Sequence, residues 1–269
     1  MKERRETREE PVKNERNEEC RYGRFVATEQ ERFRRWLEHG GGEDREAIPA
    51  ATVILLRDTA GGLETLMLRR NSKLAFGGMW VFPGGRVDAG DHLHTPGDDA
   101  HDPHDFDAAR RAAVREAQEE SGLAVDLDTL VALSHWTPPP QTPKRFATWF
   151  FVAPAPEGAV TIDDGEIHDH QWMAPAEAIA QRDRSEIELA PPTWVTLHTL
   201  ARSATVADAL ADAAAGDPQL FVTRIAFLED RMMAMWAGDA GFETGDPETS
   251  GPRHRLVMAN DTWSYERDL

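Results

Sequence analysis

The sequence predicts an α/β (α+β) fold, in which strands and helices share one core. Two runs of strand-forming residues, 48–57 and 63–69, are separated by a turn at 58–62, and this pattern predicts a β-hairpin. A glycine-rich turn follows at 82–88, where the backbone can approach a ligand closely. A helix is expected at 108–121, because its small and apolar residues lie beside a charged face. This alternation of strands and helices indicates the fold class.

The N-terminal segment, residues 1–47, is expected to be a charged extension of this domain. Residues 1–27 are dense in charge and nearly free of apolar pattern, which predicts disorder. A short helix is expected at 28–39, where apolar residues recur three and four positions apart before three glycines end it. The first residues are charged and lack the apolar stretch of a secretory signal.

Composition limits the classes of protein to which the chain can belong. Hydrophobic residues make up 40% of its 269 residues, and no apolar run reaches the roughly 20 residues of a membrane helix. The formal net charge of −18 repels nucleic acid and anionic membrane surfaces. The single cysteine, Cys20, excludes an internal disulfide and fits a reducing compartment, so a cytoplasmic location is expected.

After the predicted helix, the chain again alternates between strands and helices. Apolar runs predict strands at 130–136 and 145–153, joined by a stiff proline-rich loop. Helices are expected at 175–182, 191–202 and 205–215, and prolines open the first two. These elements complete the main domain.

We place the main domain at 48–205 and treat 206–269 as a C-terminal extension that packs on it. Apolar residues between 221 and 235 recur at helical spacing, which would suit a helix. The first residues of this segment, 221–225, are nevertheless β-forming, and 229–231 reads as a turn. A second hairpin is expected at 256–265. Strands are therefore favoured over a helix in this region.

Three carboxylates dominate the end of the predicted helix. Glu116, Glu119 and Glu120 share one helical face within one turn, where like charges repel. A hard divalent cation, which takes several carboxylate oxygens, would turn this repulsion into coordination. Gly122 can adopt a left-handed conformation and end the helix directly after the cluster. The alternative is a charged helix face paired with neighbouring arginines such as Arg115.

The glycine turn and this cluster together resemble the Nudix box, G-x5-E-x7-R-E-U-x-E-E-x-G-U, in which U is apolar. Gly85 matches the first glycine, and 115–123 match the second half at every defined position. Two departures are present. Asp91 stands where the family has glutamate, and 23 residues separate it from Arg115 where the pattern has 7, so 16 additional residues lie inside the motif.

The additional residues form an insertion at about 91–106 that is rich in histidine and aspartate. Such residues could hold a second metal ion, but a solvated loop is the simpler interpretation, because no spacing matches a known ligand pattern. The resemblance implies a Nudix α/β/α sandwich with a mixed β-sheet and a C-terminal extension.

The resemblance also implies an enzyme, a Nudix pyrophosphohydrolase that cleaves a diphosphate linkage in a nucleoside diphosphate derivative with Mg2+ or Mn2+. In-line attack by water requires the charge on the phosphate oxygens to be neutralised, and a metal also lowers the pKa of the attacking water. The implied metal ligands are the carboxylates of Glu116, Glu119 and Glu120 and the carbonyl of Gly85. The residues that would support the motif are Gly84, Asp91, Arg115 and Gly122.

The general base is left open between the helix and a later loop. Glu119 or Glu120 could take the proton, and so could Glu166, which stands just before an apolar segment. Glu166 could equally be a solvated turn residue beside two aspartates. Arg115 is expected to hold a glutamate by a bidentate pair rather than to contact substrate.

Substrate contacts are expected among cations and aromatic side chains near the glycine turn. Arg69, Arg70 and Arg145 lie at strand ends and could hold phosphate, although a surface ion pair would explain each equally well. Trp80 and Phe82 could stack on a base, with packing in the core as the alternative for both.

Weaker pieces of sequence outside the box resemble the coenzyme A diphosphatase-like branch, which also carries an insertion inside its box. They lie at 68–70, 145–146, 191–192, 238–239 and 254–256. One departure counts against coenzyme A, since Leu74 stands where the bacterial signature has arginine. The shared order of the pieces nevertheless favours coenzyme A or acyl-CoA over a nucleotide sugar.

The alternative from another class is a Nudix-domain sensor that binds a nucleotide without turnover. The complete glutamate triad argues against a sensor, whereas Asp91 and the insertion argue for one. In either case the expected partner is a small nucleoside diphosphate compound, and neither nucleic acid nor a membrane. Dimers are common in the family, so a homodimer stays open.

Overall fold

The computed structural model describes residues 46–71, 78–93, 106–142, 144–162, 165–228, 231–259 and 262–268. The predicted helix at 28–39, Leu74, most of the insertion and the first two residues of the predicted turn at 229–231 lie outside these ranges. Across the ranges that are described, no helix is long and apolar enough to cross a membrane.

The centre of the fold is an eight-stranded mixed sheet around β1 (Ile48–Thr59). This strand pairs antiparallel with β2 (Gly62–Arg70), which confirms the predicted hairpin, and parallel with β6 (Phe146–Pro154). The other strands are β3 (Trp80–Val81), β4 (Gly84–Arg86), β5 (Val131–Thr137), β7 (Ile167–Met173) and β8 (Gln219–Val222). The strand order is β3-β2-β1-β6-β5-β8, with β4 paired to β1 and β7 paired to β2.

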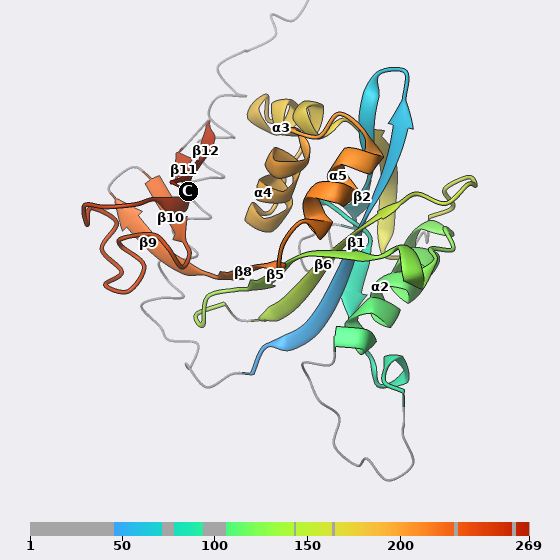
Figure 1. Cartoon of the computed structure of the whole chain (residues 1–269), viewed down its shortest axis with the longest axis horizontal. Coiled ribbons are helices and arrows are strands. Elements are labelled where there is room, and N and C mark those ends of the chain that lie inside the picture. Colours follow the sequence, from blue (N-terminus) through green and yellow to red (C-terminus); the bar gives the residue numbers. More distant parts are fainter. Residues whose placement is uncertain are drawn as a thin grey trace, which may run out of the picture.

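One face of the sheet is covered by α2 (Phe106–Ser121), the predicted helix with two more residues at its start (Figure 1). Its buried positions are mostly alanine, and Ala112 and Ala113 belong to the same apolar cluster as Val53 of β1. Small side chains at the contact allow a helix to lie close to its neighbour. Two single-turn 3-10 helices, η1 (Ala89–Asp91) and η2 (Leu127–Thr129), lie before and after α2 in the chain.

The opposite face is covered by α3 (Pro175–Asp183), α4 (Pro191–Leu200) and α5 (Val206–Ala214) (Figure 1). Prolines open α3 and α4 as predicted, and Thr205 and Asp208 form a capping box at the start of α5. Because α2 lies on the other face, the sheet is enclosed between two layers of helices. The predicted α/β/α sandwich with a mixed sheet is confirmed.

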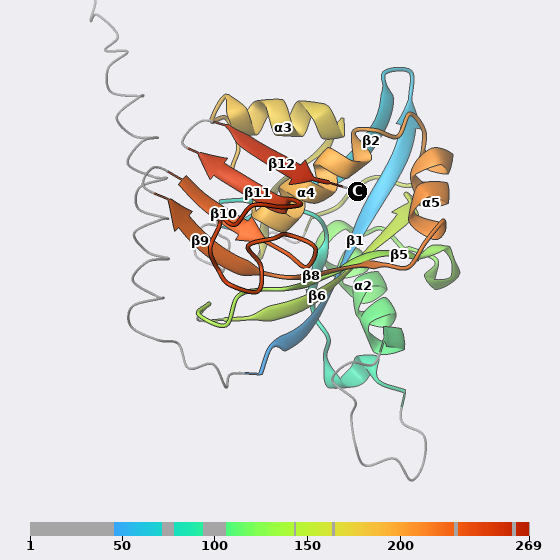
Figure 2. The same cartoon turned by 60° about the vertical axis from the view of Figure 1, so that its left-hand side comes forward.

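The C-terminal region forms a second, four-stranded antiparallel sheet (Figure 2). Its strands are β9 (Arg224–Leu228), β10 (Arg231–Met235), β11 (His254–Ala259) and β12 (Trp263–Arg267), in the order β12-β11-β10-β9. The pairing of β11 with β12 confirms the hairpin predicted at 256–265. Strands β8, β9 and β10 cover most of the described part of 221–235, as predicted, in place of a helix.

An aromatic cluster joins the two sheets. Trp136 of β5 stacks on Phe221 of β8 with ring centroids 3.8 Å apart, and both rings meet the edge or face of Trp236, which follows β10. All three side chains are buried in the apolar cluster that also contains residues of α4. The C-terminal region therefore packs on the main domain through these rings. The boundary between the two at residue 205 stays a prediction.

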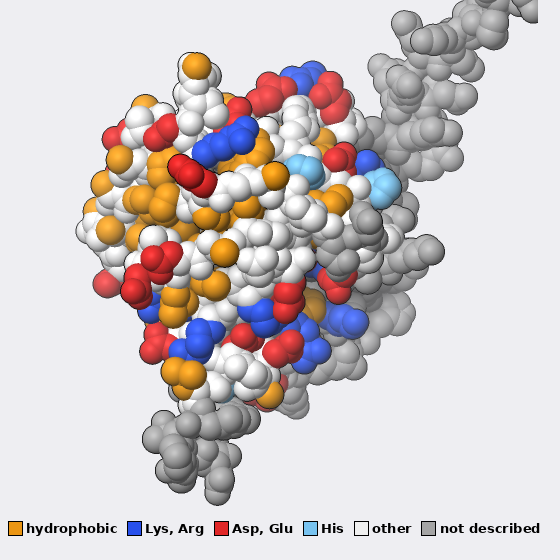
Figure 3. Space-filling view, turned by 90° about the vertical axis from the view of Figure 1, so that its right-hand side faces the viewer, with side chains coloured by type: hydrophobic (Ala, Val, Ile, Leu, Met, Phe, Trp, Pro, Cys, Tyr) orange, Lys and Arg blue, Asp and Glu red, His pale blue; other side chains and the backbone are white. Residues whose placement is uncertain are grey.

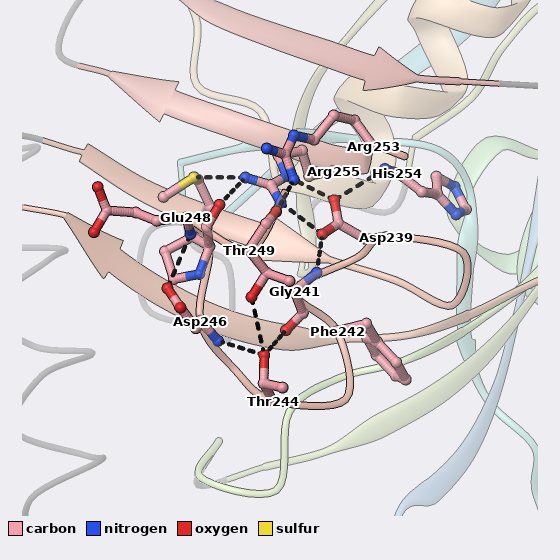
Figure 4. Close-up of polar contacts among 12 residues, drawn as sticks. Asp239, Gly241, Phe242, Thr244, Asp246, Glu248, Thr249, Arg253, His254 and Arg255 are labelled. Carbon is pink, nitrogen blue, oxygen red and sulfur yellow. Dashed lines mark hydrogen bonds and ion pairs between the residues drawn. The ribbon is translucent and has the colours of Figure 1, made fainter. Parts of the chain in front are cut away.

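The loop between β10 and β11 is closed by a buried ion pair (Figure 4). Arg255 donates to both carboxylate oxygens of Asp239 at 2.6 Å each, and to the carbonyl of Pro247 at 2.8 Å. Asp239 also accepts from the backbone N–H groups of Gly241 and His254. Burial raises the pKa of Asp239, but these bonds outweigh that effect and hold the pKa at about 2. This ion pair therefore joins two of the short sequence pieces that resemble the coenzyme A diphosphatase-like branch, 238–239 and 254–256.

The face of the molecule in Figure 3 carries both signs of charge. Acidic and basic side chains are interspersed in its lower half, and hydrophobic side chains gather in its upper left part. On this face, therefore, the acidic excess of the chain does not form a single negative patch.

Candidate active site

The glycine turn is held against α2 by its pairing with β1. Strand β4 places Gly84 opposite Thr52 and Gly85 opposite Ala51. A side chain on Gly84 would meet Thr52 and the backbone of Ala51, and one on Gly85 would meet the carboxylate of Glu116. Close approach to the backbone of β1 therefore requires glycine at position 84, whereas Gly85 lies against the side chain of Glu116.

Glu120 is the most deeply buried of the three helix carboxylates, with 4% of the residue exposed. Its Oε2 accepts a hydrogen bond from the N–H of Gly84 at 2.9 Å, whereas its buried Oε1 has no hydrogen-bond partner among the described residues. Burial raises the pKa of Glu120 to about 7, against the opposing effects of the Gly84 bond and the charge of Arg70. A buried oxygen without a partner is destabilising unless a ligand satisfies it.

Arg115 joins the two halves of the motif. Its Nε and Nη2 donate to the two oxygens of Asp91 at 3.1 and 2.9 Å, and Nη2 also donates to the carbonyl of Arg86. Its Nη1 donates to Glu116 at 2.8 Å and to Glu119 at 3.1 Å. Arg115 thus bonds to two glutamates through one nitrogen, but its bidentate partner is Asp91, which η1 brings there, and not a glutamate as predicted.

Asp91 is itself fixed by its surroundings, with 5% of the residue exposed. Its Oδ2 accepts from the N–H of Asp88 at 2.9 Å, and its carbonyl accepts from Arg111. The bond to Asp91 is the main cause of the raised pKa of Arg115, so this guanidinium stays charged. Sequence reasoning missed Asp88 and Arg111. The spacing of the two aspartates, three positions apart at the start of a helical turn, is a signal that could have found Asp88.

Glu166 approaches the cluster from a separate element, just before β7. Its Oε2 lies 3.0 Å from Nη2 of Arg70, the last residue of β2, and its carbonyl accepts from the N–H of Asn71 at 2.8 Å. Burial is the largest cause of the raised pKa of Glu116 and of Glu120, and the charge of Glu166 adds to both. Glu166 therefore lies within electrostatic reach of both carboxylates.

The end of α2 follows the prediction. The helix stops at Ser121, and Gly122 has a φ of +71°, the left-handed conformation expected of a glycine there. Its N–H donates to the carbonyl of Gln118 at 3.0 Å. The three glutamates thus lie within the last two turns of the helix, next to the glycine turn.

The other predicted substrate contacts are Arg69, Arg145, Trp80 and Phe82. Arg69 is exposed, and strand alternation directs its side chain to the face opposite that of the neighbouring arginine. Arg145 donates to the carbonyl of Pro138 at 3.4 Å. Trp80 and Phe82 are buried, with 7% and 3% exposed, in the cluster that contains α4. The structure therefore favours core packing for both rings, since neither offers a free face to a base.

The donor set fits a divalent cation. The carboxylates near the glycine turn are those of Glu116, Glu119, Glu120 and Glu166, and the arginines that contact them or lie near them are Arg70 and Arg115. The unsatisfied oxygen of Glu120 and the carboxylate of Glu116, which lies against Gly85, suit a hard cation with oxygen ligands. In the described part of the chain, no three His, Cys, Asp or Glu side chains are yet gathered around one point. Binding would have to draw the carboxylates together and compete with Arg115.

Known proteins resemble this chain in family and in fold. A family model described as the NUDIX domain matches residues 47–193, which is more than half of the chain. The crystal structure of a NUDIX hydrolase from Alicyclobacillus acidocaldarius aligns with a TM-score of 0.55 and 22% identity, covering 62% of this chain and 97% of that chain. A MutT NUDIX hydrolase from Burkholderia pseudomallei aligns with a TM-score of 0.41 and 18% identity, covering 57% of this chain and 98% of that chain. No curated protein matches the chain.

The first of these solved structures supports the fold, and the family model supports the assignment of the motif. Nudix proteins are pyrophosphohydrolases that generally cleave nucleoside diphosphate derivatives and generally use divalent metals. The prediction of an enzyme of this kind is confirmed. The chain belongs to the Nudix family of hydrolases.

Proposed function

We propose that this enzyme hydrolyses a diphosphate linkage in a nucleoside diphosphate derivative with Mg2+ or Mn2+. The observation that carries the proposal is the position of Glu120, a buried carboxylate beside the glycine turn with one oxygen left for a ligand. Glu116, Glu119 and the carbonyl of Gly85 would complete the set of metal ligands. A bound metal would neutralise charge on the phosphate oxygens and lower the pKa of the attacking water.

The surrounding residues orient these ligands. Gly84 holds one oxygen of Glu120 and leaves the other available to a ligand. Arg115 holds Glu116 and Glu119 near each other in the absence of a cation and would release them to it. Asp91 keeps Arg115 in place through two parallel hydrogen bonds, the geometry of a strong arginine–carboxylate pair.

Glu166 is the residue that we propose as the general base. The carboxylates of the helix are the proposed metal ligands, whereas Glu166, which pairs with Arg70, reaches the cluster from a separate element with its side chain 54% exposed. It would accept a proton from the water that attacks phosphorus. Glu119 and Glu120 are the alternative bases, and a substitution of each distinguishes them.

Coenzyme A or acyl-CoA is the substrate class that we propose first, because the sequence pieces outside the Nudix box resemble that branch. Arg69 and Arg145 stay predicted phosphate contacts. The presence of Asp91 in place of glutamate argues less for a sensor, because Asp91 still accepts two hydrogen bonds from Arg115 in spite of its shorter side chain. The insertion is the other feature that argues for a sensor.

The test is hydrolysis of a panel of diphosphates that includes coenzyme A, ADP-ribose, NADH and nucleotide sugars, with Mg2+ or Mn2+. Glu119→Gln is compared with the wild type, because the Glu119 side chain is 57% exposed and its loss should leave the fold intact. Glu177→Gln on α3, which is also exposed, is the matched control. We expect turnover of one compound to fall roughly a hundredfold or more in Glu119→Gln alone, as when a charged group that stabilises the transition state is removed.

Absence of turnover across the panel, with metal and a nucleotide still bound, would contradict the hydrolase and support the sensor. Equal activity of Glu119→Gln and the control would exclude Glu119 from the site. Turnover of a nucleotide sugar but not of coenzyme A would keep the reaction and change the substrate class.

A further inference from the structure

The ladder between β2 and β7 is irregular where it reaches the active site. Arg69 is opposite Asp169, but Arg70 is opposite Ile167, so His168 has no partner residue in β2. Bulges of this kind commonly re-aim a side chain next to an active site. Here the irregularity falls at Arg70, beside Glu166.

The guanidinium of Arg70 is directed at a protein carboxylate. Its Nη2 lies 3.0 Å from Oε2 of Glu166, and its side chain is 20% exposed, against 54% for Glu166. The backbone of the next residue also bonds to Glu166, since the N–H of Asn71 donates to its carbonyl. The end of β2 therefore holds both the main chain and the side chain of Glu166.

Among the described residues, the ion pair with Arg70 is the contact that holds the Glu166 carboxylate near the cluster. Glu116 and Glu120 lie within electrostatic reach of it, and like charges repel. A half-exposed side chain that is repelled by its neighbours turns toward solvent unless a cation holds it. The predicted role of Arg70 as a phosphate clamp would instead require its donors to face the substrate.

We propose that Arg70 is a positioning residue that holds the carboxylate of Glu166 beside Glu116 and Glu120. The inference rests on the proposed function, because it assigns Arg70 a task within the metal-dependent site. It changes the role of Arg70 from a group that binds substrate to one that acts through Glu166.

The test is a double-mutant cycle read by the binding of Mn2+ alone, measured as loss of the free Mn2+ signal in electron paramagnetic resonance. The four proteins are the wild type, Arg70→Ala, Glu166→Gln and the double variant. In the presence of Arg70, Glu166→Gln should weaken Mn2+ binding roughly three- to tenfold, the effect of one charge several ångströms away. In the Arg70→Ala background, the same substitution should change affinity by less than about twofold, because Glu166 has already left.

Arg57→Ala and Glu64→Gln provide the matched control. They remove an ion pair of the same kind, with Nη2 of Arg57 2.6 Å from Oε2 of Glu64, at the far end of the same hairpin. Neither should alter Mn2+ affinity. Thermal unfolding of every variant without metal checks that the fold is kept.

Equal effects of Glu166→Gln in both backgrounds would overturn the proposal, and so would no effect in either. Failure of the wild type to bind Mn2+ would overturn the proposed function as well. If Glu120→Gln abolishes Mn2+ binding but the effects of Arg70→Ala and Glu166→Gln simply add, the proposed role of Arg70 is overturned and the proposed metal site is kept.

A kinetic measurement separates positioning from phosphate binding. With the panel compound that the wild type hydrolyses, Arg70→Ala should lower kcat about as far as Glu166→Gln does, with KM within about twofold. The double variant should be no slower than either single variant. A rise in KM with unchanged kcat in Arg70→Ala would instead establish the phosphate clamp.

Discussion

Burial disfavours the charged form of the Glu120 carboxyl. With 4% of the residue exposed and one oxygen bonded to the N–H of Gly84, it has little contact with water. The spacing of the three glutamates is local, so the sequence could identify them as a group. It could not rank them, because the burial of Glu120 depends on Gly84, which lies 36 positions earlier in the chain.

This burial predicts a pH effect on stability in the absence of metal. The pKa of Glu120 is raised from 4.5 to about 7 in the fold, because the protonated carboxyl is buried more easily than the charged one. The stability that protonated Glu120 contributes to the folded state is therefore fully present below about pH 4.5 and is lost as the pH rises through 7. Ionised Glu120 should then cost about 3 kcal/mol of unfolding free energy. Relative to the wild type, Glu120→Gln should therefore gain stability between pH 4.5 and 8, measured by urea unfolding in a chelator. A difference that does not change with pH would contradict the raised pKa.

Adding Mn2+ at pH 8 provides the complementary measurement. The wild type should gain stability because the cation binds the folded state, whereas Glu120→Gln should gain much less. Equal gains in the two proteins would show that Glu120 is not a metal ligand.

At the scale of elements, local patterns and long-range contacts differ in what the sequence could predict. The hairpin β1–β2 and the helix α2 have clear periodicity within a few residues, and both were predicted with ends within two or three positions. The irregular pairing at Arg70 depends on β7, because Arg70 lies opposite Ile167, and no local pattern in β2 predicts it.

Strand β4 fits between β1 and α2, and its two glycines predict different effects of the same substitution. Gly84→Ala should lower stability by about 1–3 kcal/mol, because the added carbon meets the backbone of β1. Gly85→Ala should cost less, since its carbon meets only the movable carboxylate of Glu116, but it should weaken Mn2+ binding about tenfold or more. Urea unfolding and Mn2+ titration of both variants check this, and the reverse order of effects would contradict it.

At the scale of the whole molecule, strand β8 joins the C-terminal region to the edge of the main sheet. The strands of this region could be predicted from β-forming residues and turns. Their partners could not, because β8 pairs parallel with β5, some 80 positions earlier, and no local pattern encodes that choice. The stacking of Phe221 on Trp136 follows directly from that pairing.

The ion pair of Asp239 and Arg255 should be important for the stability of this region. Asp239→Asn should lower the unfolding free energy by roughly 3–5 kcal/mol, because it leaves a buried guanidinium without its charge partner. The pKa of Asp239 is lowered from 3.8 to about 2, so its contribution is present above about pH 4 and is lost as the pH falls toward 2, by about 2 kcal/mol. The stability difference between wild type and variant should therefore narrow below pH 4 in urea unfolding. The exposed Asp212→Asn serves as control and should show neither effect.

The parallel pairing of β5 with β8 also bears on how the protein can be divided. A protein shortened to residues 47–193, the part that matches the Nudix model, would lack most of α4, all of α5 and β8, and the whole second sheet. The edge of β5 would then offer unpaired N–H and C=O groups, and Trp136 would lose the ring that covers it. A gene cut at the limits of similarity would thus yield a product prone to aggregation, although every residue of the Nudix box would be present.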